Sequence, residues 1–236
     1  MAGARERSGA TLKSAVPRTI GLLGGSFNPA HGGHRRITRF AIDALQLDEA
    51  WWLVSPGNPL KTRAGMASLS ARVKSAQIQS RRAPIVPTAI EQALGTRYTV
   101  DTLRALRRRY PKHRFVWLMG ADNLAQFHLW KGWREIARMM PIAVIARPGY
   151  NANALASPAM AWLRRYRVSV AGFRKMGQNS FGSAPALVFL RFDPDHRSAT
   201  AIRRAGGDWA SEIIDDSEPK LRDRLTLRHI RDWQEA

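Results

Sequence analysis

Short apolar runs alternate with longer amphipathic stretches along most of the chain. The apolar runs cover residues 19–23, 50–54, 85–86, 115–119, 142–145 and 187–190. Their length and composition indicate buried strands. Apolar residues at helical spacing lie between them at 34–45, 70–80, 99–110 and 130–139. Several of these stretches begin with Ser or Thr and are followed by Gly or Pro, as helices often are. The alternation predicts an α/β fold with a parallel sheet covered by helices on both faces.

The ends and the connecting segments complete this picture. Residues 1–17 are small, polar and basic, and we expect them to form a disordered tail. One main domain then fills residues 18–236. Segments 149–157 and 172–185 are rich in Gly, Asn, Ser, Ala and Pro, so we expect surface loops there.

Membrane and secretion signals are absent from the sequence. No apolar run approaches the roughly 20 residues of a membrane span, and the first 17 residues lack the apolar segment of a signal peptide. We therefore expect a cytoplasmic protein with no membrane partner.

Charge and cysteine content narrow the chemistry. The chain has 38 Lys and Arg against 18 Asp and Glu, a net charge of +20, which favours anionic partners without choosing among nucleic acids, phosphorylated metabolites and acidic proteins. It has no cysteine. Disulfides, thiolate zinc sites and cysteine nucleophiles are therefore excluded.

The first strand ends in a loop suited to phosphate. Residues 24–34 read Gly-Gly-Ser-Phe-Asn-Pro-Ala-His-Gly-Gly-His and lead into a helix. Paired glycines let the backbone approach a ligand, Asn-Pro favours a turn, and a helix N-terminus supplies N–H donors. Because ligands of open α/β sheets bind outside the carboxyl ends of the strands, we expect functional residues to follow strand ends.

His31 and His34 are three residues apart at this helix entry. The spacing places them on one side, where imidazoles can donate to phosphate oxygens. Zinc binding is the competing use, but no other histidine has a metal-binding spacing with this pair. A glycine-rich turn with two surface histidines is the simpler alternative.

A second polar cluster follows the last predicted strand. Residues 198–203 read Ser-Ala-Thr-Ala-Ile-Arg. Ser198 and Thr200 can cap a helix and donate from their hydroxyls, while the forked guanidinium of Arg203 suits triphosphate oxygens. The alternative is an ordinary capped basic helix on the surface.

These two segments carry a family resemblance. His31-Gly32-Gly33-His34 resembles the HxGH signature of the nucleotidyltransferase superfamily, whose members use a Rossmann-like sheet. Its pairing with residues 198–203 resembles the nicotinate mononucleotide adenylyltransferases. Segments 55–61 (Ser-Pro-Gly-Asn-Pro-Leu-Lys), 97–103 (Arg-Tyr-Thr-Val-Asp-Thr-Leu), 120–124, 130 and 146–150 extend the similarity, which covers residues 18–233.

The sequence departs from this family pattern at two positions. Asn28 stands where Asp is common, and Ala199 stands where Ser is common. Neither change removes a charge that the implied reaction requires.

The resemblance implies transfer of AMP from ATP to nicotinate mononucleotide, giving nicotinate adenine dinucleotide and pyrophosphate in NAD biosynthesis. Charge neutralisation around the phosphates is assigned to His31, His34, Lys61 and Arg203. ATP binding is assigned to Gly24, Gly25, Ser26, Phe27, Asn28, Gly120, Asp122, Ser198 and Thr200. The nicotinate mononucleotide is assigned to Tyr98, Thr99, Trp130 and Arg147. From the residues alone, Trp130 also fits a core aromatic and Arg147 a structural anchor of the Pro148-Gly149 turn.

Cofactor and partner expectations follow from this chemistry. Mg²⁺ is expected to arrive with ATP and keep most of its water, so no dedicated protein cage is needed. A homo-oligomer is possible, and nucleic acid is an unlikely partner.

Three other interpretations share some of these features. A different adenylyltransferase of the superfamily, acting on pantetheine phosphate or nicotinamide mononucleotide, would share the His31 loop. A class I aminoacyl-tRNA synthetase has a similar loop, but the chain is too short for one. A non-catalytic RNA-binding protein would explain the charge, with Arg104, Arg107, Arg108, Arg109 and Lys112 as a phosphate-contacting stripe.

Overall fold

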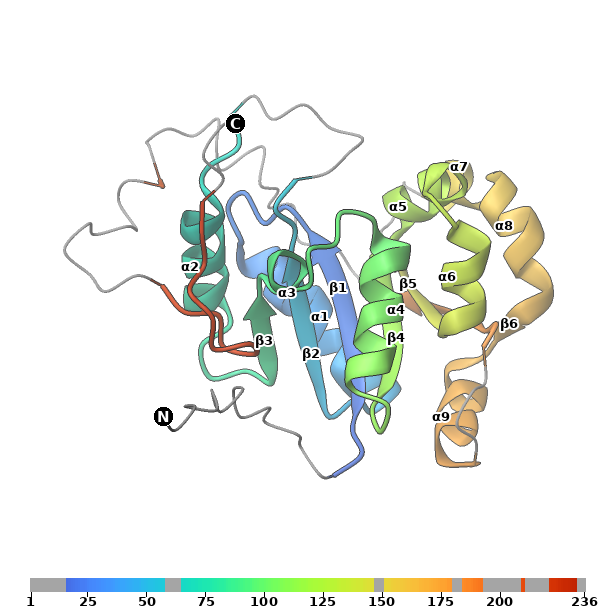
Figure 1. Cartoon of the computed structure of the whole chain (residues 1–236). Helices are drawn as coiled ribbons and strands as arrows, with labels where there is room; N and C mark the ends of the chain where they lie inside the picture. Colours follow the sequence, from blue (N-terminus) through green and yellow to red (C-terminus); the bar gives the residue numbers. More distant parts are fainter. Residues whose placement is uncertain are drawn as a thin grey trace, which may run out of the picture.

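Seven parallel strands within the described part of the chain form one sheet in the order β3-β2-β1-β4-β5-β7-β6 (Figure 1). The computed structural model describes residues 16–57, 65–146, 151–179, 184–192, 209–210 and 221–232. The strands are β1 (Thr19–Gly25), β2 (Glu49–Val54), β3 (Ile85–Thr88), β4 (Arg114–Gly120), β5 (Ile142–Ala146), β6 (Arg167–Val168) and β7 (Leu187–Arg191). The predicted α/β fold is confirmed.

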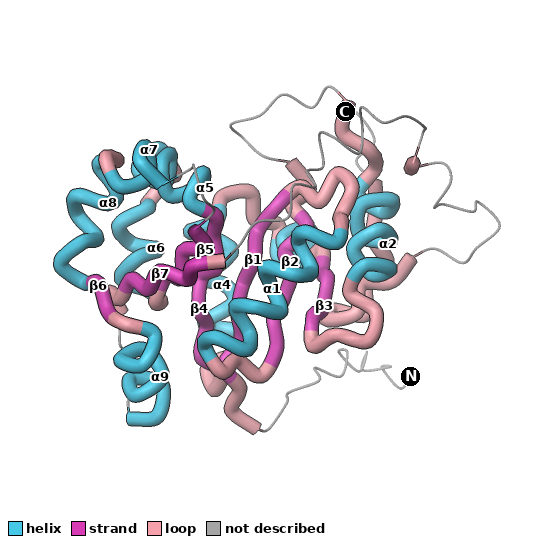
Figure 2. Tube along the Cα trace, turned by 180° about the vertical axis from the view of Figure 1, so that it is seen from behind, coloured by secondary structure: helices cyan, strands magenta, loops and turns pink. Residues whose placement is uncertain are grey.

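Helices cover both faces of the sheet. One face carries α1 (Gly32–Leu45), α2 (Leu69–Gln79) and α9 (Val170–Asn179), with α1 nearest the viewer in Figure 2. The other carries α3 (Ile90–Leu94), α4 (Thr99–Arg109), α5 (Ala121–Gln126), α6 (Trp133–Met139), α7 (Asn151–Leu155) and α8 (Pro158–Leu163). Two 3₁₀ turns follow helices of this second face: Phe127–Leu129 joins α5 to α6, and Arg164–Tyr166 leads from α8 to β6. None of the described helices combines the length and apolarity that a membrane crossing requires.

Side chains of the central strands alternate between two cores. Leu22 and Trp51 pack with Leu103 of α4 on one face, while Leu23 and Trp52 pack with α1 on the other. This two-residue period, with both faces buried, explains the nearly continuous apolar runs in the sequence.

The strand order reverses next to β1. That strand pairs with β2 on one side and with β4 on the other. Its pairing with β4 ends at Leu23 opposite Leu118. Gly24, Gly25 and Gly120 therefore lie beyond the stretch in which β1 and β4 pair with each other. A reversal of this kind creates the crevice where open α/β sheets bind ligands.

A short segment near the C-terminus packs against α2 and α3. The buried carboxylate of Asp223 accepts from the backbone N–H groups of Ala89, at 2.5 Å, and of Leu225 and Thr226. Asp232 accepts from the backbone N–H of Ser70 at 2.9 Å. Residues 221–232 therefore belong to the folded domain.

Several predicted boundaries were wrong. The helix expected at 130–139 begins only at Trp133, because Gly132 adopts φ +64° and Trp130 is extended. The loop expected at 149–157 contains α7, whose Ala154 is buried. The loop expected at 172–185 overlaps α9, and Ser169, just before this helix, accepts with its Oγ from Gly172 N–H at 3.0 Å. Burial and capping outweigh the weak helix propensities of Asn and Gly in both segments.

Candidate active site

The predicted phosphate loop connects β1 to α1 at the carboxyl edge of the sheet (Figure 1). A Cβ on Gly24 would lie 2.8 Å from Cη2 of Trp117, so a larger residue would displace this buried indole. Phe27 has φ +48°, a costly conformation for a residue with a Cβ. Its ring is buried and stacks on Trp52 at 5.1 Å between centroids, which stabilises the turn.

The two histidines are held as a pair. The His31 ring lies 3.9 Å from the His34 ring between centroids, so the expectation that they share one side is confirmed. His31 Nδ1 accepts from Gly33 N–H at 3.1 Å, and His34 Nδ1 accepts from His31 N–H at 3.2 Å. An Nδ1 atom that accepts a backbone N–H carries no proton, so each neutral ring carries its proton on Nε2.

This tautomer decides what the pair can do. With both Nδ1 atoms engaged by the start of α1, each ring is oriented and presents Nε2–H as its donor. His31 is buried and His34 is half-buried, so both rings lie near the protein interior, where charge-assisted hydrogen bonds to an anion are strong. The described residues contain no group of three or more His, Asp or Glu side chains that could hold a metal ion.

Asn28 joins this loop to the segment that follows β2. Its Nδ2 donates to Gly65 O at 2.9 Å, and its Oδ1 accepts from Ala67 N–H at 3.2 Å. An aspartate could make only the second bond, so the amide at this departure from the family pattern serves a structural purpose. Contact between Asn28 and ATP stays a prediction.

Arg72 of α2 is a site residue that sequence reasoning missed. Its side chain is 1% exposed and donates to Ser26 O at 2.9 Å, Ser55 O at 2.6 Å and Ala67 O at 3.0 Å. Burial lowers the pKa of its guanidinium to about 10, partly opposed by the Asp232 carboxylate. The guanidinium therefore ties the loop after β1 to the loop after β2.

The predicted nicotinate side forms a second cluster. Tyr98 is the N-cap residue of α4, and its ring lies 4.3 Å from Lys131 Nζ. Gly132 packs so closely on Val100 that a Cβ there would lie 3.1 Å from a Val100 methyl. The segments 98–100 and 130–132 are thus adjacent, as the assignment of both to one substrate requires.

Trp130 combines features of both interpretations. Its ring is half-buried and meets Trp117 at 6.1 Å and Phe127 at 5.4 Å between centroids, both edge to face. The indole is therefore anchored in the core yet partly accessible. Thr99 begins α4 beside it, where the first backbone N–H groups of a helix lack helical acceptors and suit a carboxylate.

Gly120 and Asp122 lie at the end of β4. The Asp122 carboxylate folds over Gly120, and a Cβ on Gly120 would collide with its Oδ1. Asp122 itself is exposed. Both residues are therefore beside the β1 loop, at the strand-order reversal.

Five predicted residues lie outside the described residues: Lys61, Arg147, Ser198, Thr200 and Arg203. The strands that precede them are described. β2 leads to residue 61, β5 ends at Ala146, and β7 ends at Arg191. Because all these strands are parallel to β1, the chain leaves each at the edge that carries His31 and His34.

A glycine loop and paired imidazoles at the reversal of a parallel sheet define a nucleotidyltransferase, and the family comparison agrees. A family model described as cytidylyltransferase-like matches residues 22–205. A relative from Erythrobacter litoralis (strain HTCC2594), named "Probable nicotinate-nucleotide adenylyltransferase", is 72% identical, with 92% of this chain and 96% of the relative covered. One of the same name from Parvibaculum lavamentivorans is 52% identical, covering 81% and 93%. The chain belongs to the nicotinate-nucleotide adenylyltransferase family.

Solved structures support the fold independently. The Plasmodium falciparum nicotinic acid mononucleotide adenylyltransferase complexed with NaAD matches with a TM-score of 0.59 at 14% identity, covering 79% of this chain and 83% of that one. A second structure of that enzyme, complexed with APC, matches with a TM-score of 0.55 over the same shares. At this identity the likeness establishes the architecture.

Proposed function

We propose that this chain transfers the AMP moiety of ATP to nicotinate mononucleotide, giving nicotinate adenine dinucleotide and pyrophosphate. The observation that carries the proposal is the oriented imidazole pair of His31 and His34, whose Nδ1 atoms are both engaged by backbone N–H groups. The names of relatives at 72% and 52% identity support the choice of substrates.

The reaction needs no general base. A phosphate oxygen of the mononucleotide attacks the α-phosphorus of ATP, the bond from that phosphorus to the oxygen bridging to the β-phosphorus breaks, and pyrophosphate leaves with the electron pair. The attacking phosphate is largely ionised at neutral pH. The protein must instead bring two polyanions into line and stabilise the charge that develops on the leaving group.

The residues divide this work between them. We assign charge stabilisation to the Nε2–H donors of His31 and His34 together with Lys61 and Arg203. Ser198, Thr200 and the backbone of residues 24–27 act as neutral donors. Asp122 lies near the adenosine. Mg²⁺ enters with ATP as part of the substrate.

The nicotinate side of the site discriminates the second substrate. Trp130 stacks on the pyridine ring, and the backbone at Tyr98 and Thr99 receives its carboxylate, with Arg147 adding positive charge. A cytoplasmic location and a homo-oligomeric state stay predictions.

The substitution His31→Asn tests the imidazole. Asn is among the preferred N-cap residues, so its side chain can keep the cap on α1 while the Nε2–H donor is lost. We expect the rate of pyrophosphate release from ATP and nicotinate mononucleotide to fall about 10²- to 10³-fold, the usual effect of removing one such donor. Urea unfolding of the same preparation shows whether the fold is preserved.

Two comparisons complete this test. His229→Ala removes an exposed histidine from the segment 221–232 and should leave turnover within about twofold of the native rate. Nicotinamide mononucleotide assayed alongside should react more slowly than nicotinate mononucleotide. Native turnover in a folded His31→Asn variant would refute the role of the imidazole, and equal rates with both mononucleotides would refute the assigned substrate.

A further inference from the structure

A cavity lies at the edge of the sheet opposite the candidate active site. It has a volume of about 830 Å³, and its walls include Thr19 and Arg114, the first residues of β1 and β4. The phosphate loop instead follows the last residue of β1. Seven residues of strand separate these ends, or about 20 Å at roughly 3.3 Å per residue. The cavity is therefore distinct from the site that holds His31 and His34.

One wall of this cavity is rich in arginine. Arg104, Arg107 and Arg108 line it from one face of α4, at the three- and four-residue spacings that bring helical side chains together. Arg104 is paired with Glu135, the only acidic residue among the described residues that line the cavity, with Nη2 to Oε2 at 2.5 Å. Arg107 and Arg108 form no salt bridge with any described residue. Their positive charge is thus left for a ligand.

A further arginine is oriented from the facing side. Arg174 of α9 lines the cavity, and its Nε donates to Ala44 O at 2.9 Å. This bond fixes the plane of the guanidinium and leaves its terminal N–H groups as a fork of the kind that binds phosphate in two-point contacts. Arginines therefore converge on the cavity from α4 and from α9.

Part of the remaining lining is apolar. Met139, Met176, Phe173 and the prolines at 111 and 141 line the same cavity. Methionine and aromatic side chains make favourable contacts with flat aromatic rings, and proline presents an apolar ring surface. A cavity with an arginine wall and an apolar wall fits a molecule that has both several phosphates and an aromatic base.

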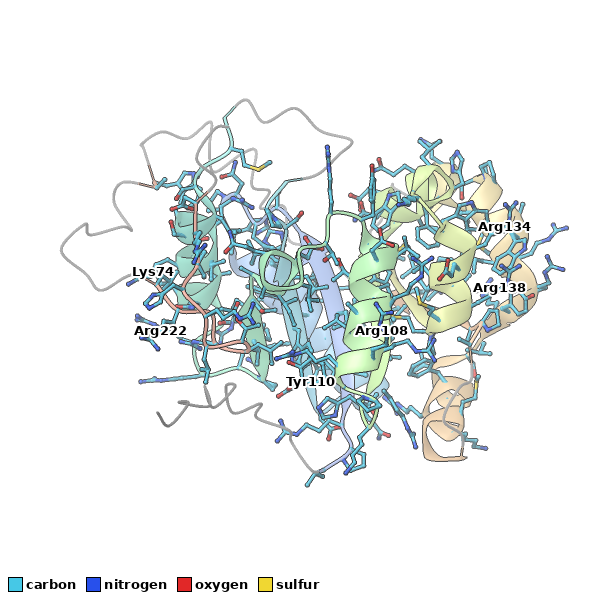
Figure 3. The ribbon with its side chains drawn as sticks, viewed as in Figure 1. Lys74, Arg108, Tyr110, Arg134, Arg138 and Arg222 are labelled. Carbon is cyan, nitrogen blue, oxygen red and sulfur yellow. The ribbon has the colours of Figure 1, made fainter. Side chains whose placement is uncertain are left out.

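The neighbouring basic residues have other contacts. Arg109 lies over the Tyr110 ring at 5.9 Å and does not line the cavity. Arg134 and Arg138 of α6, labelled at the right of Figure 3, lie over the Trp133 and Trp162 rings at 4.5 and 5.5 Å. Figure 3 shows Arg108 on α4 close to Tyr110, away from this second group. The basic stripe expected on α4 is therefore divided between a cavity wall and separate surface residues.

We propose that this cavity is a non-catalytic binding site for a nucleoside polyphosphate, with the phosphates on Arg107, Arg108 and Arg174 and the base against the methionine and phenylalanine wall. The site is separate from the reaction proposed above and does not depend on it.

Calorimetric titration with ATP tests the proposal directly. The full chain carrying Arg107→Gln and Arg108→Gln is compared with one carrying Arg109→Gln and Lys112→Gln. Both pairs lose two positive charges from the same end of α4, but only the first pair lines the cavity. We expect the cavity variant to bind one ATP fewer per chain than the native protein, and the control pair to bind as many as the native protein.

Further measurements separate this site from the active site and from general charge. Pyrophosphate release by the cavity variant should stay native, because neither arginine belongs to the reaction machinery. Tripolyphosphate should bind the cavity at least tenfold more weakly than ATP, because it lacks the base. Equal ATP stoichiometry in both variants would overturn the proposal. So would tripolyphosphate binding as tightly as ATP, or a single-stranded oligoadenylate that binds more tightly than ATP and is weakened equally by both variants.

Discussion

Glu91 is a buried acidic residue of α3. It is 8% exposed, and the hydroxyls of Ser55, after β2, and of Thr102 in α4 lower its pKa. Thr102 Oγ1 also donates to Tyr98 O at 3.3 Å. Burial raises the pKa of this carboxyl to about 7, although the two hydroxyls partly oppose the change. The folded protein therefore holds a proton that the unfolded chain releases near its ordinary pKa of 4.5.

This difference predicts how stability varies with pH. Between pH 4.5 and 7 the folded state binds more protons at Glu91 than the unfolded state, so the free energy of unfolding falls as pH rises. The interval from 4.5 to about 7 corresponds to about 3 kcal/mol. Glu91→Gln cannot titrate, so its stability should rise relative to the native protein by up to about 3 kcal/mol between pH 5 and 8, measured by urea unfolding.

Glu135→Gln is the matched control for this comparison. Its hydrogen bond with Arg104 lowers the pKa of the Glu135 carboxyl, so that group is ionised in both states above pH 5 and should produce no such divergence. Parallel stability curves for the native protein and Glu91→Gln across this range would contradict the assignment.

At the scale of elements, α2 organises loops that belong to two different strands. Its Arg72 donates to carbonyl groups after β1 and after β2, and Ser75 Oγ accepts from Ala30 N–H at 3.1 Å. The helix thus holds the phosphate loop from behind without containing any of the predicted ligand-binding residues.

The substitution Arg72→Lys tests this arrangement. Lysine keeps the charge but cannot span the carbonyl groups with a planar fork, so buried acceptors lose their donors. We expect the free energy of unfolding to fall by about 3 kcal/mol, as when a buried charged network is broken. The kcat of the folded enzyme should fall at least tenfold because the loops at Ser26 and Ser55 shift.

Arg224→Lys provides the comparison, because Arg224 is exposed on the C-terminal segment. Its free energy of unfolding and its kcat should both stay native. A folded Arg72→Lys enzyme with native kcat would show that α2 does not position the loops.

The elements also show what the sequence could and could not predict. The long strands and α1, α2 and α4 were predictable because each has a continuous apolar run or a clear period. Helices α3, α5, α7 and α8 span only five or six residues, too few for a period to be read, and they form because tertiary packing buries residues such as Ile90 and Ala154.

Some residues of the candidate site could likewise be predicted from the sequence, and others could not. The loop of residues 24–34 has a local signature, so its position at the end of β1 was predictable. Arg72 and Glu91 carry no such signature, because an arginine or a glutamate in a helix is usually exposed. Only the packing of α2 and α3 against the strand ends places these two side chains inside the protein.

Across the whole molecule, positive charge is spread over distant surfaces. Lys74 and Arg222 are labelled at one end of the molecule in Figure 3, and Arg134 and Arg138 at the other. With a net charge of +20, the protein should attract anions from beyond contact distance, over roughly 8 to 10 Å at physiological ionic strength. This general field is separate from the few groups that contact the phosphates.

The field predicts how salt affects the proposed reaction. Because both substrates are anions, raising sodium chloride from about 20 to about 500 mM, which shortens the Debye length from roughly 21 to roughly 4 Å, should lower kcat/KM for each by about tenfold, within the range expected for electrostatically steered association. The kcat at saturating substrate should change less than about twofold, since the bound phosphates are shielded from solvent ions. Steady-state assays of pyrophosphate release at constant free Mg²⁺ measure both constants. A kcat/KM independent of salt would mean that the charge of +20 does not steer these substrates, and a fall confined to kcat would place the effect within the bound complex.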